Sequence, residues 1–161
     1  MRVKAHEALA QRVGKALTMH HLMLATAESC TGGLIAGAIT DVAGSSGWFE
    51  RGFITYSNEA KVEMLGVRAE TLVAYGAVSE ATAAEMAQGA IANSRADLGV
   101  AVTGVAGPDG GTAEKPVGMV CFGWARKGAV DTATLHFAGD REAVRVATVE
   151  AALAGLLDRL D

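Results

Sequence analysis

The chain has 161 residues, of which half are hydrophobic and a fifth are charged, and its formal net charge is −4. This length supports one buried core and is short for two independent domains, so residues 1–161 are expected to form a single domain, with no general positive field to attract nucleic acid. Two cysteines without metal-ligand or redox spacing indicate a reducing cytoplasm, and no segment has the pattern of a signal peptide or a bilayer-spanning helix, so we expect no membrane association.

Helical and extended patterns alternate along the first two thirds of the chain, as they do in layered α/β domains. Hydrophobic residues recur at helical spacing in some segments and form short apolar or alternating runs in others. The predicted elements, in chain order, are a helix over 3–19, a strand over 22–27, a helix over 31–42, a strand over 49–56, a helix over 58–65, a helix over 79–94 with Ser79 as its N-cap, and a strand over 98–103.

The last third of the chain begins with a long segment rich in glycine, proline and polar residues, 104–116, which we interpret as a binding loop. Two extended runs follow, 117–125 and 130–137, and their short connection predicts a hairpin at the edge of a mixed sheet. Asp140 is expected to cap a final helix whose apolar residues form one continuous stripe that packs on the sheet.

The sequence TAESCTGG, residues 26–33, lies where a buried strand is expected to stop and a helix to start. Ser29 stands at this point, where the backbone N–H groups of a helix N-terminus lack intrahelical partners and can stabilise a developing oxyanion. Gly32 and Gly33 have no Cβ, so a ligand or a neighbouring strand can approach the first turn closely. The local pattern fits a serine nucleophile, and it fits equally well a Ser29 or Thr31 that only caps the helix.

A serine nucleophile needs a base, and Lys61 is the favoured candidate. It shares a predicted helical face with Ala60, Met64 and Leu65, so it is expected to point toward the core. Loss of solvation there would lower its pKa and leave a neutral amine that can accept a proton. The alternative is a lysine whose stem lies along an apolar surface while its ammonium group stays in water. Tyr56, at the end of the second strand, either positions the reacting groups with its hydroxyl or only packs.

The histidines offer weaker candidates for the base, because none is predicted at a strand end or in a loop. Each is interpreted as a surface or half-buried residue, and the four are His6, His20, His21 and His136.

Two features suggest an anionic substrate. The loop over 103–112 follows a strand and is rich in glycine, so its N–H groups can turn toward a phosphate or a sugar hydroxyl. Arg141 and Arg145 occupy the first turns of the last helix, where cations oppose the helix dipole unless an anion is bound between them. Glu142 offsets part of this charge, so a pair of solvated arginines remains the alternative interpretation.

Several segments together carry a resemblance that no one of them carries alone. They are TAESCTGG at 26–33, GFITYSNEAKVEMLGV at 52–67, VSEATAAEMA at 78–87, VTGVAGPDGGT with KPVG at 102–118, and GDREAVR at 139–145. In this order they resemble the nicotinamide-nucleotide amidase family, also known as the C-terminal domain of the competence/damage-inducible protein CinA, over nearly the whole chain. The resemblance implies a single three-layer α/β/α domain with a mixed, mostly parallel sheet. It also implies hydrolysis of nicotinamide mononucleotide to nicotinic acid mononucleotide and ammonia, with no metal and no organic cofactor.

The resemblance implies roles for the candidate residues as well. Ser29 would be the nucleophile and Lys61 its base in a two-step acyl transfer, with Tyr56 in support. Cys30, Thr31 and Gly32 would form the turn that holds the oxyanion, although Glu28, Cys30 and Thr31 stay ambiguous between orienting the nucleophile, donating N–H groups and holding the turn. The substrate-binding candidates are Glu28, Gly33, Thr103, Gly104, Gly107 and Arg145.

Two alternatives from other functional classes remain open at this level. A cysteine amidase would use Cys30 as its nucleophile, one residue later than Ser29. A non-catalytic module that binds a nucleotide or a protein, linked to competence or the damage response, would keep the same pocket motifs without releasing ammonia. In either case we expect a cytoplasmic protein, and the edge hairpin with glycine-rich surface loops favours a homodimer.

Overall fold

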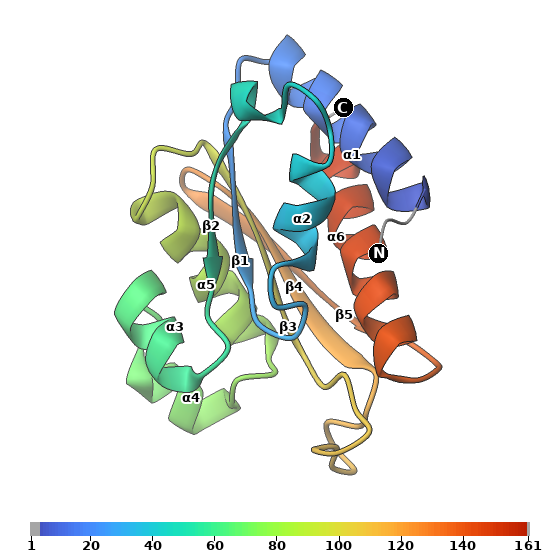
Figure 1. Cartoon of the computed structure of the whole chain (residues 1–161). Helices are drawn as coiled ribbons and strands as arrows, with labels where there is room; N and C mark the ends of the chain where they lie inside the picture. Colours follow the sequence, from blue (N-terminus) through green and yellow to red (C-terminus); the bar gives the residue numbers. More distant parts are fainter. Residues whose placement is uncertain (1–3, 161) are drawn as a thin grey trace.

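The computed structural model describes residues 4–160, which form one five-stranded sheet with helices on both of its faces (Figure 1). The helices are α1 (Lys4–Met19), α2 (Leu34–Thr40), the 3-10 helix η1 (Ser45–Gly47), α3 (Asn58–Leu65), α4 (Ala69–Tyr75), α5 (Glu80–Ala92) and α6 (Arg141–Leu160). The strands are β1 (Leu24–Glu28), β2 (Phe49–Ile54), β3 (Leu98–Gly104), β4 (Met119–Arg126) and β5 (Ala129–His136). The predicted three-layer α/β/α arrangement is confirmed.

The sheet is mixed, with the strand order β2-β1-β3-β4-β5. β1 is parallel to both β2 and β3, whereas β4 is antiparallel to both of its neighbours. Only β4 therefore runs against the common direction, which confirms a mixed, mostly parallel sheet. β4 and β5 form the predicted edge hairpin, in which Arg126 lies opposite Ala129.

The two faces of the sheet are covered by different helices. α1, α2 and α6 lie on one face, and α3, α4 and α5 lie on the other (Figure 1). Side chains of a strand alternate between faces, so Leu24 of β1 joins the core beneath α1, α2 and α6, while Ala25 and Ala27 join the core beneath α5. The small residues on this second face let α5 approach closely, and a Cβ on Gly99 of β3 would lie 2.4 Å from the Ala87 carbonyl oxygen of α5.

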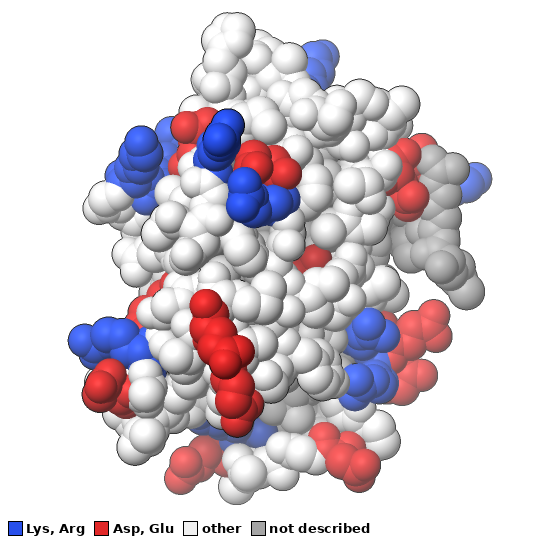
Figure 2. Space-filling view, turned by 60° about the vertical axis from the view of Figure 1, so that its left-hand side comes forward, with Lys and Arg blue, Asp and Glu red and all other residues white. Residues whose placement is uncertain are grey.

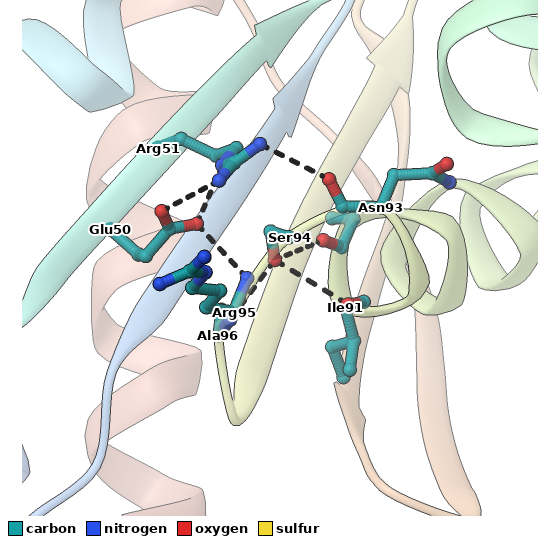
Figure 3. Close-up of polar contacts among 8 residues, drawn as sticks. Glu50, Arg51, Ile91, Asn93, Ser94, Arg95 and Ala96 are labelled. Atoms are coloured by element: carbon teal, nitrogen blue, oxygen red, sulfur yellow. Dashed lines mark hydrogen bonds and ion pairs between the residues drawn. The ribbon is translucent and has the colours of Figure 1, made fainter.

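Polar contacts hold the amino-terminal edge of the sheet, away from the candidate site. The Glu50 carboxylate of β2 accepts hydrogen bonds from Arg51 Nε at 2.6 Å and from the backbone N–H of Arg95 at 3.2 Å (Figure 3). Arg51 Nη1 in turn donates to the Asn93 carbonyl at 3.4 Å. These contacts fix the turn between α5 and β3 against the edge strand.

Most predicted elements are present, and the differences have local causes. α2 begins at Leu34 instead of residue 31, because Gly32 and Gly33 adopt φ values of 57° and 110° that no α-helix contains. The short helix α4 was not predicted: it leaves Val73 88% and Tyr75 60% exposed, so its sequence shows no clear apolar stripe. The predicted caps are confirmed, since Ser79 Oγ accepts from the Thr82 N–H and Asp140 Oδ1 from the Ala143 N–H.

The surface carries no extended basic region on the side shown in Figure 2. Among the described residues on that face, Lys and Arg side chains form small groups with Asp or Glu nearby, and one elongated acidic group stands by itself, with uncharged surface between the groups. Within residues 4–160, no helix combines the length and the apolar composition that a membrane crossing requires.

The topology brings three strand ends together at one edge. β1, β2 and β3 are parallel and adjacent, so the segments after Glu28, Ile54 and Gly104 all leave the sheet at the same edge. The chain crosses from β1 to β2 on one side and later returns to β3 on the other, which makes this edge a topological switch point. Ligands of open α/β sheets bind at such points.

Candidate active site

Ser29 and Lys61 meet at this edge of the sheet. Ser29 follows directly after β1, Lys61 lies in α3, and the distance between Ser29 Oγ and Lys61 Nζ is 3.1 Å. Both side chains are buried, with Ser29 8% and Lys61 1% exposed. The two residues that the sequence analysis selected as nucleophile and base are therefore in hydrogen-bond contact.

Backbone carbonyls surround the Lys61 amine. Its Nζ lies 2.9 Å from the Thr55 carbonyl oxygen, 3.4 Å from that of Tyr56 and 3.5 Å from that of Ser57. Ser57 Oγ caps α3 by accepting from the Ala60 N–H, and helical side chains tilt toward the helix N-terminus, so the Lys61 stem reaches back over these carbonyls. Burial lowers the pKa of Lys61 from its ordinary value.

Lys61 points into the core, as predicted. Its burial excludes the alternative in which the stem lies along an apolar surface and the ammonium group is in water. The predicted helical face was only partly correct. Leu65, one turn after Lys61, is buried, but Met64 is 42% exposed and belongs to the solvent side of the helix. The buried face of this short helix is narrower than its sequence suggested.

Glu28 occupies the N-terminus of α2. Its Oε1 accepts from Thr31 Oγ1 at 2.5 Å and from the Ile35 N–H at 2.9 Å, and its Oε2 accepts from the Ala36 N–H at 3.0 Å. Gly33 N–H also points to Oε1, at 3.3 Å. The Glu28 side chain is 1% exposed, so this carboxylate satisfies backbone donors in the first turn of α2 and leaves the turn over residues 30–32 as the place for an oxyanion.

The turn from Ser29 to Gly32 leaves a different pair of donors. The Gly32 N–H donates to the Ser29 carbonyl at 3.1 Å, which removes Gly32 from the predicted oxyanion donors. Within residues 4–160, the N–H groups of Cys30 and Thr31 make no hydrogen bond to another residue. Arg145 supports the same turn, because its Nε donates to the Cys30 carbonyl at 3.2 Å and its Nη2 to the Thr31 carbonyl at 3.1 Å.

The Cys30 thiol is held in its protonated form. Burial raises the pKa of Cys30 to about 11, outweighing the opposite effects of a hydrogen bond to its own backbone and of Arg145. A thiol of this kind is a poor nucleophile near neutral pH, since the thiolate is the reactive species.

Comparison with known proteins identifies the family of this chain. The family model for the CinA C-terminal domain matches residues 6–160. The chain belongs to the CinA C-terminal domain family. A protein of Enterobacter agglomerans named nicotinamide-nucleotide amidohydrolase PncC is 59% identical over 144 residues, covering 89% of this chain and 87% of that protein. The protein of the same name from Escherichia coli K12 is 57% identical over 138 residues, covering 85% of this chain and 84% of that protein. The crystal structure of the competence/damage inducible protein CihA from Agrobacterium tumefaciens superposes with a TM-score of 0.95 at 51% identity, covering 98% of this chain and 97% of that one.

In this CinA-family domain the hydroxyl of Tyr56 contacts an arginine of α6. The side chain is 62% exposed, and Arg141 Nη2 donates to its hydroxyl at 3.2 Å. Arg141 Nη1 also donates to the Gly107 carbonyl at 2.8 Å. The part of Tyr56 that contacts Lys61 is its backbone carbonyl. Arg141, which the sequence analysis treated only together with Arg145, thus links Tyr56 to the glycine-rich loop.

The remaining substrate-binding candidates shape the same edge. Thr103, at the end of β3, is buried and donates from Oγ1 to the Ala77 carbonyl at 2.9 Å. A Cβ on Gly104 would lie 2.8 Å from the Met119 carbonyl oxygen, and one on Gly107 would lie 2.5 Å from Val117 Cγ1. These glycines allow the loop over 104–118 to fold back onto β4.

The histidines lie outside the site. His20, His21 and His136 are exposed, as predicted, but His6 is buried, contrary to expectation. Its Nε2 lies 3.0 Å from the Val146 carbonyl oxygen, so α6 covers it. This contact between α1 and α6 could not be read from the spacing within α1 alone.

Proposed function

We propose that this domain hydrolyses the carboxamide of nicotinamide mononucleotide to nicotinic acid mononucleotide and ammonia, with Ser29 as nucleophile and Lys61 as base. The observation that carries the proposal is the 3.1 Å contact between Ser29 Oγ and the buried amine of Lys61. The names of the relatives from Enterobacter agglomerans and Escherichia coli supply the substrate.

The first step is attack on the carboxamide. In its neutral form the Lys61 amine keeps two N–H bonds for the carbonyls around it and offers one lone pair to the Ser29 hydroxyl proton. Ser29 Oγ then bonds to the carboxamide carbon, and the carbonyl electron pair moves onto oxygen. The carbonyl of Thr55 at 2.9 Å stabilises the ammonium that Lys61 becomes.

The oxyanion is assigned to the N–H groups of Cys30 and Thr31. They follow the nucleophile directly, and no other residue among 4–160 uses them, whereas the first turn of α2 donates to Glu28. Preorganised donors of this type provide a large share of the barrier reduction in acyl transfer.

The second half of the reaction regenerates the enzyme. The carbon–nitrogen bond breaks, and the leaving nitrogen takes the proton from Lys61 and departs as ammonia. The neutral amine next removes a proton from water, whose oxygen attacks the ester formed with Ser29. Collapse of this second intermediate releases the acid and returns the proton to Ser29 Oγ, so one amide and one water become one acid and one ammonia. No metal or organic cofactor takes part in these steps.

The decisive experiment measures ammonia release from nicotinamide mononucleotide by the wild type, Ser29→Ala and Lys61→Met. Both variants are expected to lose at least about 10³-fold in kcat while circular dichroism stays unchanged. A wild type that binds the mononucleotide without releasing ammonia would instead support the non-catalytic module, and full activity in Ser29→Ala would exclude the serine mechanism.

We further propose that the enzyme works in the cytoplasm as a homodimer. The solvent-exposed edges of the sheet, β2 and the hairpin strand β5, offer surfaces for a second copy. Light scattering on the eluate of a gel-filtration column tests the dimer, and a monomeric mass at working concentration would contradict it.

A further inference from the structure

Two arginines one helical turn apart at the start of α6, Arg141 and Arg145, have no carboxylate partner among the described residues 4–160. The ion pairs found within residues 4–160 join Arg51 to Glu50, Arg68 to Glu85 and Arg159 to Asp131. Arg141 and Arg145 donate only to neutral oxygens. A guanidinium met by neutral acceptors keeps most of its attraction for an anion.

The surroundings of Arg145 make it a positioning group. It is half-buried, and both of its hydrogen bonds go to carbonyls of the turn that follows Ser29. A Cβ on Gly32 would lie 3.6 Å from Arg145 Nη2, so the guanidinium lies against this turn. The Cys30 carbonyl and the Thr31 N–H belong to one peptide unit, so Arg145 holds the peptide that carries one of the two assigned oxyanion donors.

Arg141 is placed differently. Its side chain is exposed and donates to the hydroxyl of Tyr56 at 3.2 Å and to the carbonyl of Gly107 at 2.8 Å. Of the five N–H donors of a guanidinium, these two contacts leave three for a ligand. The planar fork of arginine matches the oxygens of a phosphate.

Tyr56 links Arg141 to the reactive pair. Tyr56 contacts Lys61 Nζ through its carbonyl at 3.4 Å and contacts Arg141 through its hydroxyl. The length of one tyrosine therefore separates the catalytic amine from the exposed guanidinium. A pyridine mononucleotide carries its carboxamide and its phosphate at opposite ends, so a carboxamide at Ser29 requires a phosphate site away from the reactive pair, and Arg141 offers one.

The local electrostatics favour an anion on one side of Arg141. As the first residue of α6, Arg141 opposes the helix dipole, and a bound anion would relieve that repulsion. The neighbouring Asp140 carboxylate is occupied as the helix cap, where it accepts from the Ala143 N–H at 2.9 Å. Glu142 is exposed and follows Arg141 directly in the chain. The partners of Arg141 at Tyr56 and Gly107 are neutral, so the anion is assigned to that side.

A hollow of about 730 Å³ adjoins this position and is lined by both arginines. Acidic side chains limit what its interior can hold, because a phosphate placed deep inside would approach them. They are Glu7, Asp41 and Glu142. Tyr56 and Gly107, to which Arg141 donates, are not among the residues that line this hollow, so the phosphate is assigned to that side of Arg141.

We propose that Arg141 binds the phosphate of the substrate and sets the preference for a mononucleotide, while Arg145 positions the oxyanion turn. This inference rests on the proposed function for the identity of the substrate. The two arginines are expected to have different kinetic effects. Substitution of Arg141 should raise KM for substrates that carry the phosphate. Substitution of Arg145 should lower kcat for substrates with or without the phosphate.

The test compares two substrates that differ only by the phosphate, nicotinamide mononucleotide and nicotinamide riboside, in the wild type, Arg141→Met, Arg141→Lys and Arg145→Met. The preference is the ratio of the two kcat/KM values. Arg141→Met is expected to reduce the preference by about tenfold to a hundredfold, mainly through KM for the mononucleotide, and to leave riboside turnover near the wild-type rate. Arg141→Lys keeps the charge and should retain part of the preference. Arg12→Met, which removes an exposed arginine of α1, is the matched control and should change nothing.

The results separate this inference from the proposed function. An unchanged preference in Arg141→Met, or a loss of preference in Arg145→Met instead, overturns the assignment of the phosphate to Arg141. Calorimetry on Ser29→Ala measures substrate binding without turnover. In this background, Arg141→Met should weaken binding of the mononucleotide but not of the riboside. If the wild type releases no ammonia while this binding difference persists, the proposed function fails and the phosphate site stands.

Discussion

Glu28 and Ser29 are consecutive residues whose side chains act on opposite faces of the sheet. Glu28 caps α2 on one face, with hydrogen bonds to the Ile35 and Ala36 N–H groups, and Ser29 meets Lys61 of α3 on the other. The alternation of side chains at the end of a strand makes this division possible. The carboxylate thus fixes the start of the helix that follows the nucleophile without entering the reactive pair.

Glu28→Gln is expected to destabilise the fold and to lower activity. An amide would place an N–H₂ group among donors that now point at a carboxylate, and the charge-assisted hydrogen bonds would be lost. The expected loss is about 2–3 kcal/mol in the free energy of unfolding, measured by urea denaturation. Glu63→Gln, on the exposed side of α3, is the control and should stay within about 0.5 kcal/mol of the wild type. Equal stability of the two variants would show that the cap is dispensable.

The pH profile of kcat/KM should report Lys61. Burial lowers the pKa of this amine below the ordinary lysine value of 10.5, and only the neutral form can accept the Ser29 proton. Activity is therefore expected to rise with pH through the pKa of Lys61 and to level off above it, with the midpoint below 10.5. Circular dichroism at each pH controls for unfolding. A midpoint at or above the ordinary lysine value would mean that the amine is not the base.

Cys30→Ala should retain most of the activity. The pKa of about 11 keeps the Cys30 thiol protonated, and the protonated thiol is a poor nucleophile. The assay measures ammonia release at a saturating concentration of the mononucleotide. Cys121→Ala, which removes the other buried thiol, is the control. Loss of turnover in Cys30→Ala alone, with intact secondary structure, would revive the cysteine mechanism.

Substitution by alanine should have opposite effects on stability at two nearby glycines, Gly33 and Gly37. Gly33 has a φ of 110°, and a Cβ there would lie 3.1 Å from Ile54 Cδ1, so Gly33→Ala should cost about 1–3 kcal/mol and displace the turn that carries Ser29. Gly37 lies inside α2 with open space around its Cα, so Gly37→Ala should be neutral or stabilise by up to about 1 kcal/mol. The measurements are the urea midpoint and the rate of ammonia release of both variants. Equal losses of stability in Gly33→Ala and Gly37→Ala would contradict the prediction.

The sequence predicted those parts of the site that depend on local pattern. The burial of Lys61 and the cap at Asp140 could be anticipated because they follow from spacing within one segment. The contacts of Arg145 could not, since its acceptors are backbone carbonyls more than a hundred positions earlier in the chain. The occupation of the α2 N-terminus by Glu28 was missed for a related reason: an acidic residue at a strand end fits ligand binding and helix capping equally well.

The helix α4 shows the corresponding limit for the fold. Its seven residues place Val73 in solvent and bury Thr71, which donates to a Glu85 carboxylate oxygen at 2.5 Å. Its position is decided by contacts with α5, and hydrophobic periodicity carries no signal of them.

The carbonyls that surround the Lys61 amine have a consequence for how this site tolerates change. Every oxygen in that set other than Ser29 Oγ belongs to the main chain of residues 55–57, and each amino acid supplies the same carbonyl. A library randomised at Tyr56 should therefore keep the reactive lysine in place across many side chains. Proline is the foreseeable exception, because it alters the path of the peptide itself.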